Sequence, residues 1–229
     1  KRGKIFSRLG KEITVAVKSG GPDPDSNIRL RTAISSAKTL NMPKDNILRA
    51  IKKGEANDPD SNYEEVRYEG YGPSGVAIIV DAMTNNKNRT ASEIRSTFSK
   101  CGGNLGETGS VSYNFKRLGT ITLKKTLTEE KIFEFAIENG SVDFEVLDDE
   151  YIIYCEAKDL HILSEKIINK FNTSTTAQLI WKSDISVNIA SDNAETLFKL
   201  LNLLEENEDV QNVSSNFEVS EEVLTALTQ

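Results

Sequence analysis

The sequence predicts an α+β fold, in which an N-terminal three-helix domain is followed by two ferredoxin-like α/β domains, one inserted in the other. Three observations predict it. Apolar residues recur at helical spacing through the first 54 residues. Strand and helix patterns then follow the order β-α-β-β-α-β from residue 119 to residue 181. A β-β-α-β pattern before this segment and a β-α-β pattern after it supply the pieces of a second α/β domain.

The helical domain is expected to cover residues 1–58. Its first helix spans residues 3–18, because apolar side chains share one face there and a Gly-Gly pair follows. A second helix is predicted over residues 27–39. Pro43 suits the first turn of a third helix, and Gly54 is expected to cap its C-terminus.

Residues 63–117 plus 184–229 are expected to form one discontinuous α/β domain, and residues 118–183 the inserted ferredoxin-like domain. Within the first part, the Thr90-to-Glu93 spacing fits a capping box and predicts a helix that begins near Thr90. The alternating stretch from Val111 to Phe115 predicts the strand that follows it.

The composition indicates a globular protein of the cytoplasm. Charged residues make up 28% of the chain and hydrophobic residues 38%. No apolar run is long enough for a membrane helix and no signal-peptide pattern opens the chain, so no membrane partner is expected. The chain starts at Lys1 and not at Met, from which we expect further residues upstream. The cysteines, Cys101 and Cys155, lie far apart and suggest no disulfide framework.

Charge is distributed unevenly along the chain. Residues 1–54 hold 13 Lys and Arg against 4 Asp and Glu, a net charge of +9, and residues 84–117 hold 6 against 2, a net charge of +4. Residues 118–229 hold 8 against 22, a net charge of −14. The first helix presents its cations on one stripe with Glu12 as the one acidic exception. An ordinary solvated face normally mixes signs, so the stripe favours a surface that binds a polyanion.

The segment TNNKNRTASEIRSTFSKCGGNLGETGSVSYNF, residues 84–115, suggests a second contact region. It contains a predicted helix between two loops. The first loop brings polar donors to a helix N-terminus, where anions are favoured. The second loop, residues 102–110, is glycine-rich and is expected to be flexible and to expose backbone N–H groups. An ordinary turn remains the alternative for these glycines, because neither loop matches a nucleotide-binding motif.

These patterns select the candidate nucleic-acid contacts. They are Lys1, Arg2, Lys4, Arg8, Lys11, Arg29, Arg31, Lys44, Arg49, Lys52, Lys53, Lys87, Asn88, Arg89, Arg95 and Lys100.

We expect neither an enzyme nor a cofactor or metal site. His161 is the single histidine, so a histidine metal site or a catalytic triad is not expected. His161 itself is expected to be a packing or surface residue, and Cys155 a buried, inert thiol. Trp181 and the tyrosines are expected in the core and not as stacking platforms for bases.

Three stretches carry a resemblance to a known family: KRGKIFSRLGKEITVAVKSGG, NIRLRTAISSAKTLNMPKDNILRAIKKG and EGYGPSGVAIIVDAMTNNKNRTASEIRSTFSKCGGNLGETGSVSYNF. Together they resemble the YebC/PmpR family over nearly the whole chain, most densely in residues 1–117. The resemblance implies three domains: a helical one, a discontinuous α/β one and an inserted α/β one. It also implies a further basic stretch upstream. Cys101 stands where the family is expected to carry histidine, which counts against acid–base chemistry there.

Family resemblance implies two functions between which the sequence does not choose. One is a cytoplasmic DNA-binding transcriptional regulator. The other is a translation factor that binds the ribosome or its RNA and assists elongation, as mitochondrial relatives do. The sequence contains neither a clear helix-turn-helix signature nor a strong aromatic RNA-binding motif that would decide between them. The acidic residues 118–229 are expected to contact proteins, and the protein is expected to be a monomer.

Overall fold

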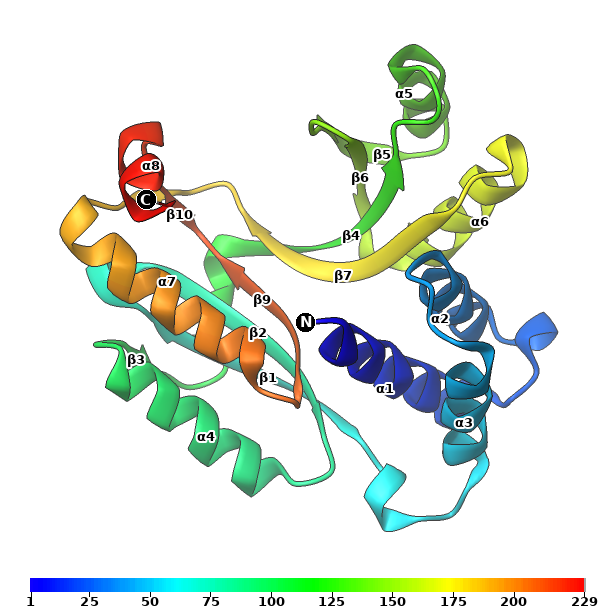
Figure 1. Ribbon diagram of the computed structural model, residues 1–229, viewed down its shortest axis with the longest axis horizontal. Helices are drawn as coiled ribbons and strands as arrows, with labels where there is room; N and C mark the ends of the chain where they lie inside the picture. Colours follow the sequence, from blue (N-terminus) through cyan, green and yellow to red (C-terminus); the bar gives the residue numbers. More distant parts are fainter. Residues whose placement is uncertain (229) are drawn as a thin grey trace. The chain divides into compact units, whose positions relative to one another are not determined.

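The computed structural model describes residues 1–228 and divides the chain into two compact units (Figure 1). The first unit combines residues 1–61 with 117–180, and the second combines residues 62–116 with 181–229. Among the described residues, no helix is both long enough and apolar enough to cross a bilayer. The expected mixed fold is confirmed, with N-terminal helices followed by two four-stranded sheets. The division into three domains stays a prediction.

Three α-helices open the first unit: α1 (Arg2–Gly20), α2 (Ile28–Thr39) and α3 (Lys44–Glu55). They share one apolar core, and Asn27 caps α2 by accepting the Leu30 N–H at 3.0 Å. Gly54 does not cap α3, contrary to the sequence prediction. It lies inside the helix, where an added Cβ would stand 2.6 Å from the Cβ of Val17. Close approach of α3 to α1 therefore explains this glycine.

A ferredoxin-like α/β layer completes the first unit. Its elements are β4 (Phe115–Lys124), α5 (Glu129–Glu138), β5 (Ser141–Val146), β6 (Glu150–Glu156), α6 (Leu160–Phe171) and β7 (Thr175–Ser183). The strands lie in the order β5-β6-β4-β7, in which β6 is antiparallel to both β4 and β5. Apolar residues of the strands and of both helices form one buried cluster, which includes Ile121, Ile132, Ile153, Leu163 and Ile167.

Helix α2 packs against this α/β layer within the first unit. His161 Nδ1 lies 2.9 Å from Thr32 Oγ1, and the Ala177 N–H donates to Ser36 Oγ at 3.1 Å. Thr39 Oγ1 donates to the carbonyl of residue 175 at 3.0 Å. The helical segment therefore uses one side of α2 to hold α6 and β7.

The second unit contains β1 (Glu64–Tyr71), β2 (Ala77–Thr84), α4 (Lys87–Lys100), β3 (Asn104–Leu105), β8 (Val187–Asn188), α7 (Ser191–Glu206), β9 (Val210–Ser215), β10 (Phe217–Glu218) and α8 (Glu221–Thr228). The four-stranded sheet has the order β3-β1-β2-β9, and β8 pairs in parallel with β10. The sheets of the two units share one feature. In the second unit, β2 leads through α4 to β3, and β1 lies between β2 and β3 in the sheet; in the first unit, β4 leads through α5 to β5, and β6 lies between them.

Short 3₁₀ turns occur in both units. They cover Pro24–Ser26, Pro59–Ser61, Pro73–Gly75, Ser112–Asn114 and Ala157–Asp159.

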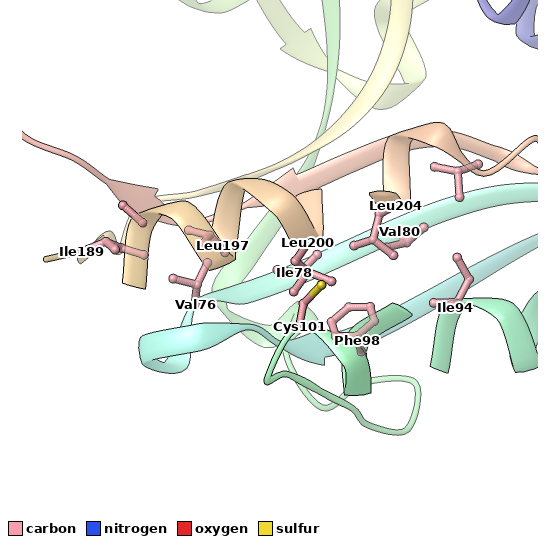
Figure 2. Packing of buried hydrophobic residues seen from close by; sticks show 12 residues of the cluster. Val76, Ile78, Val80, Ile94, Phe98, Cys101, Ile189, Leu197, Leu200 and Leu204 are labelled. Atoms are coloured by element: carbon pink, nitrogen blue, oxygen red, sulfur yellow. The ribbon is translucent and has the colours of Figure 1, made fainter. Parts of the chain in front are cut away.

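Helices α4 and α7 bury their apolar faces in the core of the second unit (Figure 2). Phe98 and Ile94 of α4 and Leu200 of α7 are fully buried. Cys101 follows α4 and is 2% exposed, and it belongs to the same cluster. The sheet strand β2 supplies buried residues on both of its faces, because Ala77 and Ile79 pack in a smaller cluster with Phe115 and Trp181.

Two predictions in this unit are wrong. The helix does not begin at Thr90, because Asn86 accepts the Arg89 N–H at 3.1 Å and starts α4 one turn earlier. Residues 111–115 also do not form the strand that their alternating pattern predicted. The N–H groups of Val111 and Ser112 bond to the Glu69 side chain, and a 3₁₀ turn covers Ser112–Asn114. Only Phe115 belongs to a strand, as the first residue of β4.

Candidate nucleic-acid interface

Helix α1 carries a row of cations opposite its buried face. Its buried residues run from Ile13 to Val17, towards the helix C-terminus. Lys4, Arg8 and Lys11 are spaced four and three residues apart, so they lie on one side of the helix. All three are at least partly exposed, and the N-terminal Lys1 and Arg2 are exposed. The predicted stripe therefore exists as a solvent-facing row.

Helix α3 presents a second group of cations. Arg49, Lys52 and Lys53 are exposed on the face opposite the buried Ile47 and Ala50. The helix packs beside α1, and Thr14 Oγ1 of α1 donates to the Ala50 carbonyl at 3.0 Å. Lys44 is exposed at the start of the helix. Both helices of the packed pair thus turn cations to solvent.

Two cations of α2 serve the fold. Arg29 donates two hydrogen bonds to Glu12, from Nε at 2.8 Å and from a terminal nitrogen at 3.1 Å. Arg31 pairs with Glu165 of α6 and also donates to the carbonyl oxygen of Pro24 at 2.8 Å. The hydrogen bond to Glu165 raises the pKa of the Arg31 guanidinium. These two side chains are the least suited of the candidates to bind a phosphate.

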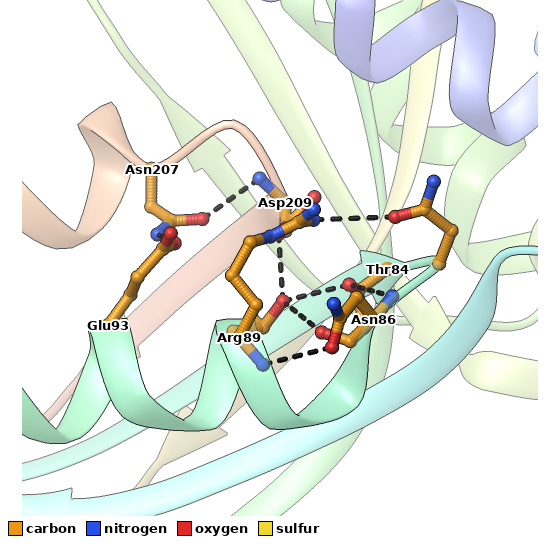
Figure 3. Close-up of polar contacts among 8 residues, drawn as sticks. Thr84, Asn86, Arg89, Glu93, Asn207 and Asp209 are labelled. Carbon is orange, nitrogen blue, oxygen red and sulfur yellow. Dashed lines mark hydrogen bonds and ion pairs between the residues drawn. The ribbon is translucent and has the colours of Figure 1, made fainter. Parts of the chain in front are cut away.

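A buried carboxylate of the protein lies at the N-terminal turn of α4, where the sequence suggested a phosphate (Figure 3). Asp209 is 5% exposed. Its Oδ2 accepts from Thr90 Oγ1 at 2.7 Å and from the guanidinium of Arg89 at 2.9 Å. Thr90 Oγ1 also lies within hydrogen-bond distance of Thr84 Oγ1, at 2.8 Å. Hydrogen bonding to Asp209 raises the pKa of the Arg89 guanidinium. Arg89 therefore joins α4 to the turn before β9.

A second buried carboxylate fills the glycine-rich loop. The Glu69 side chain is fully buried and accepts the N–H groups of Gly109 at 2.7 Å, Val111 at 3.2 Å and Ser112 at 2.6 Å. Arg67 Nε donates to Glu69 Oε2 at 3.0 Å. Burial by itself raises the pKa of the Glu69 carboxyl, but these N–H groups bond its charged form and hold the pKa below its ordinary value. The loop's donors bind a protein carboxylate, and the loop is tied down.

The two loops also lie at opposite ends of α4. A 14-residue helix is roughly 20 Å long. One phosphate therefore cannot contact both ends. Lys87 pairs with Glu64 of β1 at the first end. Asn88 and Arg95, seven residues apart, lie on one exposed side of the helix, and Lys100 is exposed at the second end.

Sequence reasoning missed an exposed tyrosine beside the second loop. Tyr113 is 73% exposed, although the tyrosines were expected in the core. The neighbouring Tyr71 is 36% exposed and donates to the Ser110 carbonyl at 3.3 Å, and hydrogen bonding with Tyr113 raises the pKa of the Tyr71 phenol. The alternating pattern of residues 111–115 predicted a strand, and the tyrosine within it was expected in the core. In the structure, Glu69 accepts the N–H groups of Val111 and Ser112, and the 3₁₀ turn at Ser112–Asn114 leaves Tyr113 facing solvent.

The described residues contain no group of three or more His, Cys, Asp and Glu side chains that could hold a metal ion. Both cysteines are buried, as expected for Cys155, and burial raises the pKa of the Cys155 thiol to about 11. His161 is half-buried against α2, and its burial lowers its pKa.

Comparisons with known proteins match the chain along almost its full length. Residues 1–57 match the model of the TACO1/YebC protein N-terminal domain, and residues 63–217 match the model of the TACO1/YebC second and third domain. The chain belongs to the TACO1/YebC family. It is also similar to a conserved hypothetical protein, Aq1575, from Aquifex aeolicus, known from its crystal structure. The two share 48% identity with a TM-score of 0.89, over 97% of this chain and 93% of that one.

The family boundaries separate the candidate cations into two groups. The TACO1/YebC N-terminal domain holds the rows on α1 and α3. The second match holds α4 and both buried carboxylates, Glu69 and Asp209. The expected resemblance to YebC proteins is thus confirmed.

Proposed function

We propose that this TACO1/YebC protein regulates gene expression by binding the phosphate backbone of a nucleic acid through α1 and α3. The observation that carries the proposal is the partly exposed row of Lys4, Arg8 and Lys11 beside a helix that exposes Arg49, Lys52 and Lys53. Cations that dock on phosphates release condensed counterions, which favours binding to a polyanion. Within residues 1–54, the net charge of +9 makes the helical segment the favoured contact.

Transcriptional regulation through duplex DNA is the first form of the proposal. A helix of 19 residues is about 28 Å long and can follow a groove or a phosphate strand. Contacts made by lysine and arginine to phosphate would position the protein without reading sequence. Base-specific contacts would have to come from other side chains or from DNA shape.

A translation factor that binds the ribosome or its RNA, and assists elongation, is the second form. Tyr113 favours it, because a solvent-facing aromatic ring on a tied-down loop offers a surface on which an unpaired base can stack. The acidic half of the chain is also better suited to protein contacts than to a long duplex.

A salt titration tests the proposal. Binding is measured against salt for duplex DNA, structured RNA and ribosomes, with wild type and two triple variants. One variant reverses the α1 row (Lys4→Glu, Arg8→Glu, Lys11→Glu), and the other reverses the α3 group (Arg49→Glu, Lys52→Glu, Lys53→Glu). Each lost phosphate contact should flatten the slope of log affinity against log salt by roughly 0.7–0.9.

A charge-matched control separates a specific surface from bulk charge. Lys124→Glu, Lys170→Glu and Lys199→Glu make the same change in net charge at exposed positions of the acidic half. They should leave the slope unchanged. Equal slopes for wild type and both test triples, with all three ligands, would refute the proposal. A change with RNA or ribosomes alone would select the translation form, and a change with DNA alone the transcription form.

A further inference from the structure

Helix α5 and strand β5 leave apolar side chains in solvent. Phe133 is 43% exposed, Ile137 53% and Val146 41%. Phe133 and Ile137 lie one turn apart, whereas Ile132 and Ala136 on the neighbouring face of the helix are fully buried. The helix is thus apolar on two faces, only one of which packs in the core. Contiguous apolar exposure of this kind marks an interaction surface.

Phe133 and Val146 line a groove between α5 and β5. An open groove of about 440 Å³ is lined by Glu129, Glu130, Phe133, Phe144 and Val146. The rings of Phe133 and Phe144 meet edge to face with centroids 5.3 Å apart, and Phe144 lies 5.6 Å from the ring of Tyr151 in the core. The floor of the groove is therefore anchored, and its apolar wall comes from both a helix and a strand.

The charge around the groove is strongly negative. Residues 128–150 hold nine Asp and Glu and one Lys. Glu129 and Glu130 themselves line the groove beside its aromatic wall. A nucleic acid would be repelled, and a second copy of this surface would bring carboxylates against carboxylates. Cationic side chains complement it.

The edge of β5 is less suited to binding by strand addition. The Phe144 N–H donates to Oδ1 of Asp143 at 2.8 Å, so a local carboxylate already uses a donor of this strand. The pairing of β5 with β6 also shifts register between Ser141 and Asp143. Bulges and charges are common devices against added strands. Side-chain insertion into the groove is the remaining mode of contact.

We propose that the groove between α5 and β5 docks a basic protein segment, which inserts apolar side chains against Phe133 and Val146 and places Lys or Arg beside Glu129 and Glu130. The site shares no residue with the cationic faces of α1 and α3. Its failure or success is therefore independent of the nucleic-acid proposal.

A displayed library of random 16-residue peptides serves as the probe. It is selected on the full chain, with counter-selection on the Val146→Ser, Glu130→Lys variant, which changes two residues of the groove. The enriched peptides should carry an excess of Lys and Arg and two apolar residues three or four positions apart. The absence of enriched peptides, or a neutral or acidic consensus, would overturn the proposal.

The best enriched peptide is then measured by fluorescence anisotropy. Val146→Ser and Glu130→Lys should each weaken its binding at least tenfold without changing the melting temperature, because both side chains line the groove. Ile162→Ser is the matched control, because Ile162 is 52% exposed on α6 of the same unit. Equal affinity for wild type and Val146→Ser, or equal loss with Ile162→Ser, would show that the groove is not the site.

Discussion

The cationic faces of α1 and α3 differ from the α4 region in how far their polar groups face solvent. On α1 and α3, Lys and Arg side chains stand on solvent-facing sides of packed helices. Around α4, the helix N-terminus and the glycine-rich loop each hold a buried carboxylate of the protein itself, Asp209 and Glu69. A segment rich in glycine, asparagine and cations can therefore use its hydrogen-bond donors to stabilise the fold. Solvent exposure distinguishes such structural donors from candidate ligand-binding donors better than residue type does.

The largest effect should come from Glu69. Glu69→Gln removes the charge that accepts three backbone N–H groups and the Arg67 side chain, which leaves the donors of a buried site poorly paired. Chemical denaturation should show a loss of roughly 3 kcal/mol in the free energy of unfolding. Glu64→Gln, at a 60% exposed position on the same strand, is the control and should cost about 0.5 kcal/mol or less.

Equal stability of the two variants would mean that the glycine-rich loop does not depend on Glu69. The loop would then be open to an external anion, and the distinction between the two regions would fail.

Asp209 should have the next largest effect. Asp209→Asn keeps the shape but weakens the bonds from Thr90 and Arg89, and we expect a loss of about 2 kcal/mol in denaturation. Arg95→Ala on the exposed side of α4 should leave stability unchanged. A larger loss for Arg95→Ala than for Asp209→Asn would contradict the structural role of this network.

Acid should affect the two units in different pH ranges. His161 has a pKa lowered from 6.5, chiefly by burial and also by Arg29, against the raising effect of Glu12 and Glu165. Its neutral form is favoured in the fold, so its contribution is present above pH 6.5 and is lost as pH falls from 6.5 through the lowered value. Glu69 has a pKa below 4.5, so its contribution is present above pH 4.5 and is lost as pH falls through that lower value.

Unfolding free energy measured against pH checks both signs. His161→Gln should remove the slope that begins near pH 6.5, and Glu69→Gln should remove the slope below pH 4.5. Either slope surviving in its own variant would assign it to another group.

The smallest effect belongs to Lys87. Its partner Glu64 is exposed, and exposed ion pairs contribute between about 0 and 1 kcal/mol. Lys87→Ala should change the unfolding free energy by less than about 0.5 kcal/mol in denaturation. If Lys87→Ala instead weakens nucleic-acid binding as much as the α1 triple variant does, the α4 region is part of the nucleic-acid interface as well.

Local periodicity in the sequence predicted the three N-terminal helices and the ferredoxin-like pattern of residues 119–181, because helical and strand periodicities are local properties of the chain. It also determined the cationic stripe on α1, since residues three and four apart share a helix face. The family resemblance followed from whole motifs.

Only the tertiary structure decided which charged groups face solvent. Asp209 lies 119 residues from Thr90 along the chain, and Glu69 lies 40 residues from Gly109. No local pattern shows that these carboxylates meet those donors. The bonds of Glu69 also replaced the strand expected at 111–115 by a turn and left Tyr113 facing solvent. The packing of α3 against α1 decided that Gly54 lies inside a helix–helix contact. A buried charge must find its partner wherever the fold brings one, and that requirement is not written in the spacing of neighbouring residues.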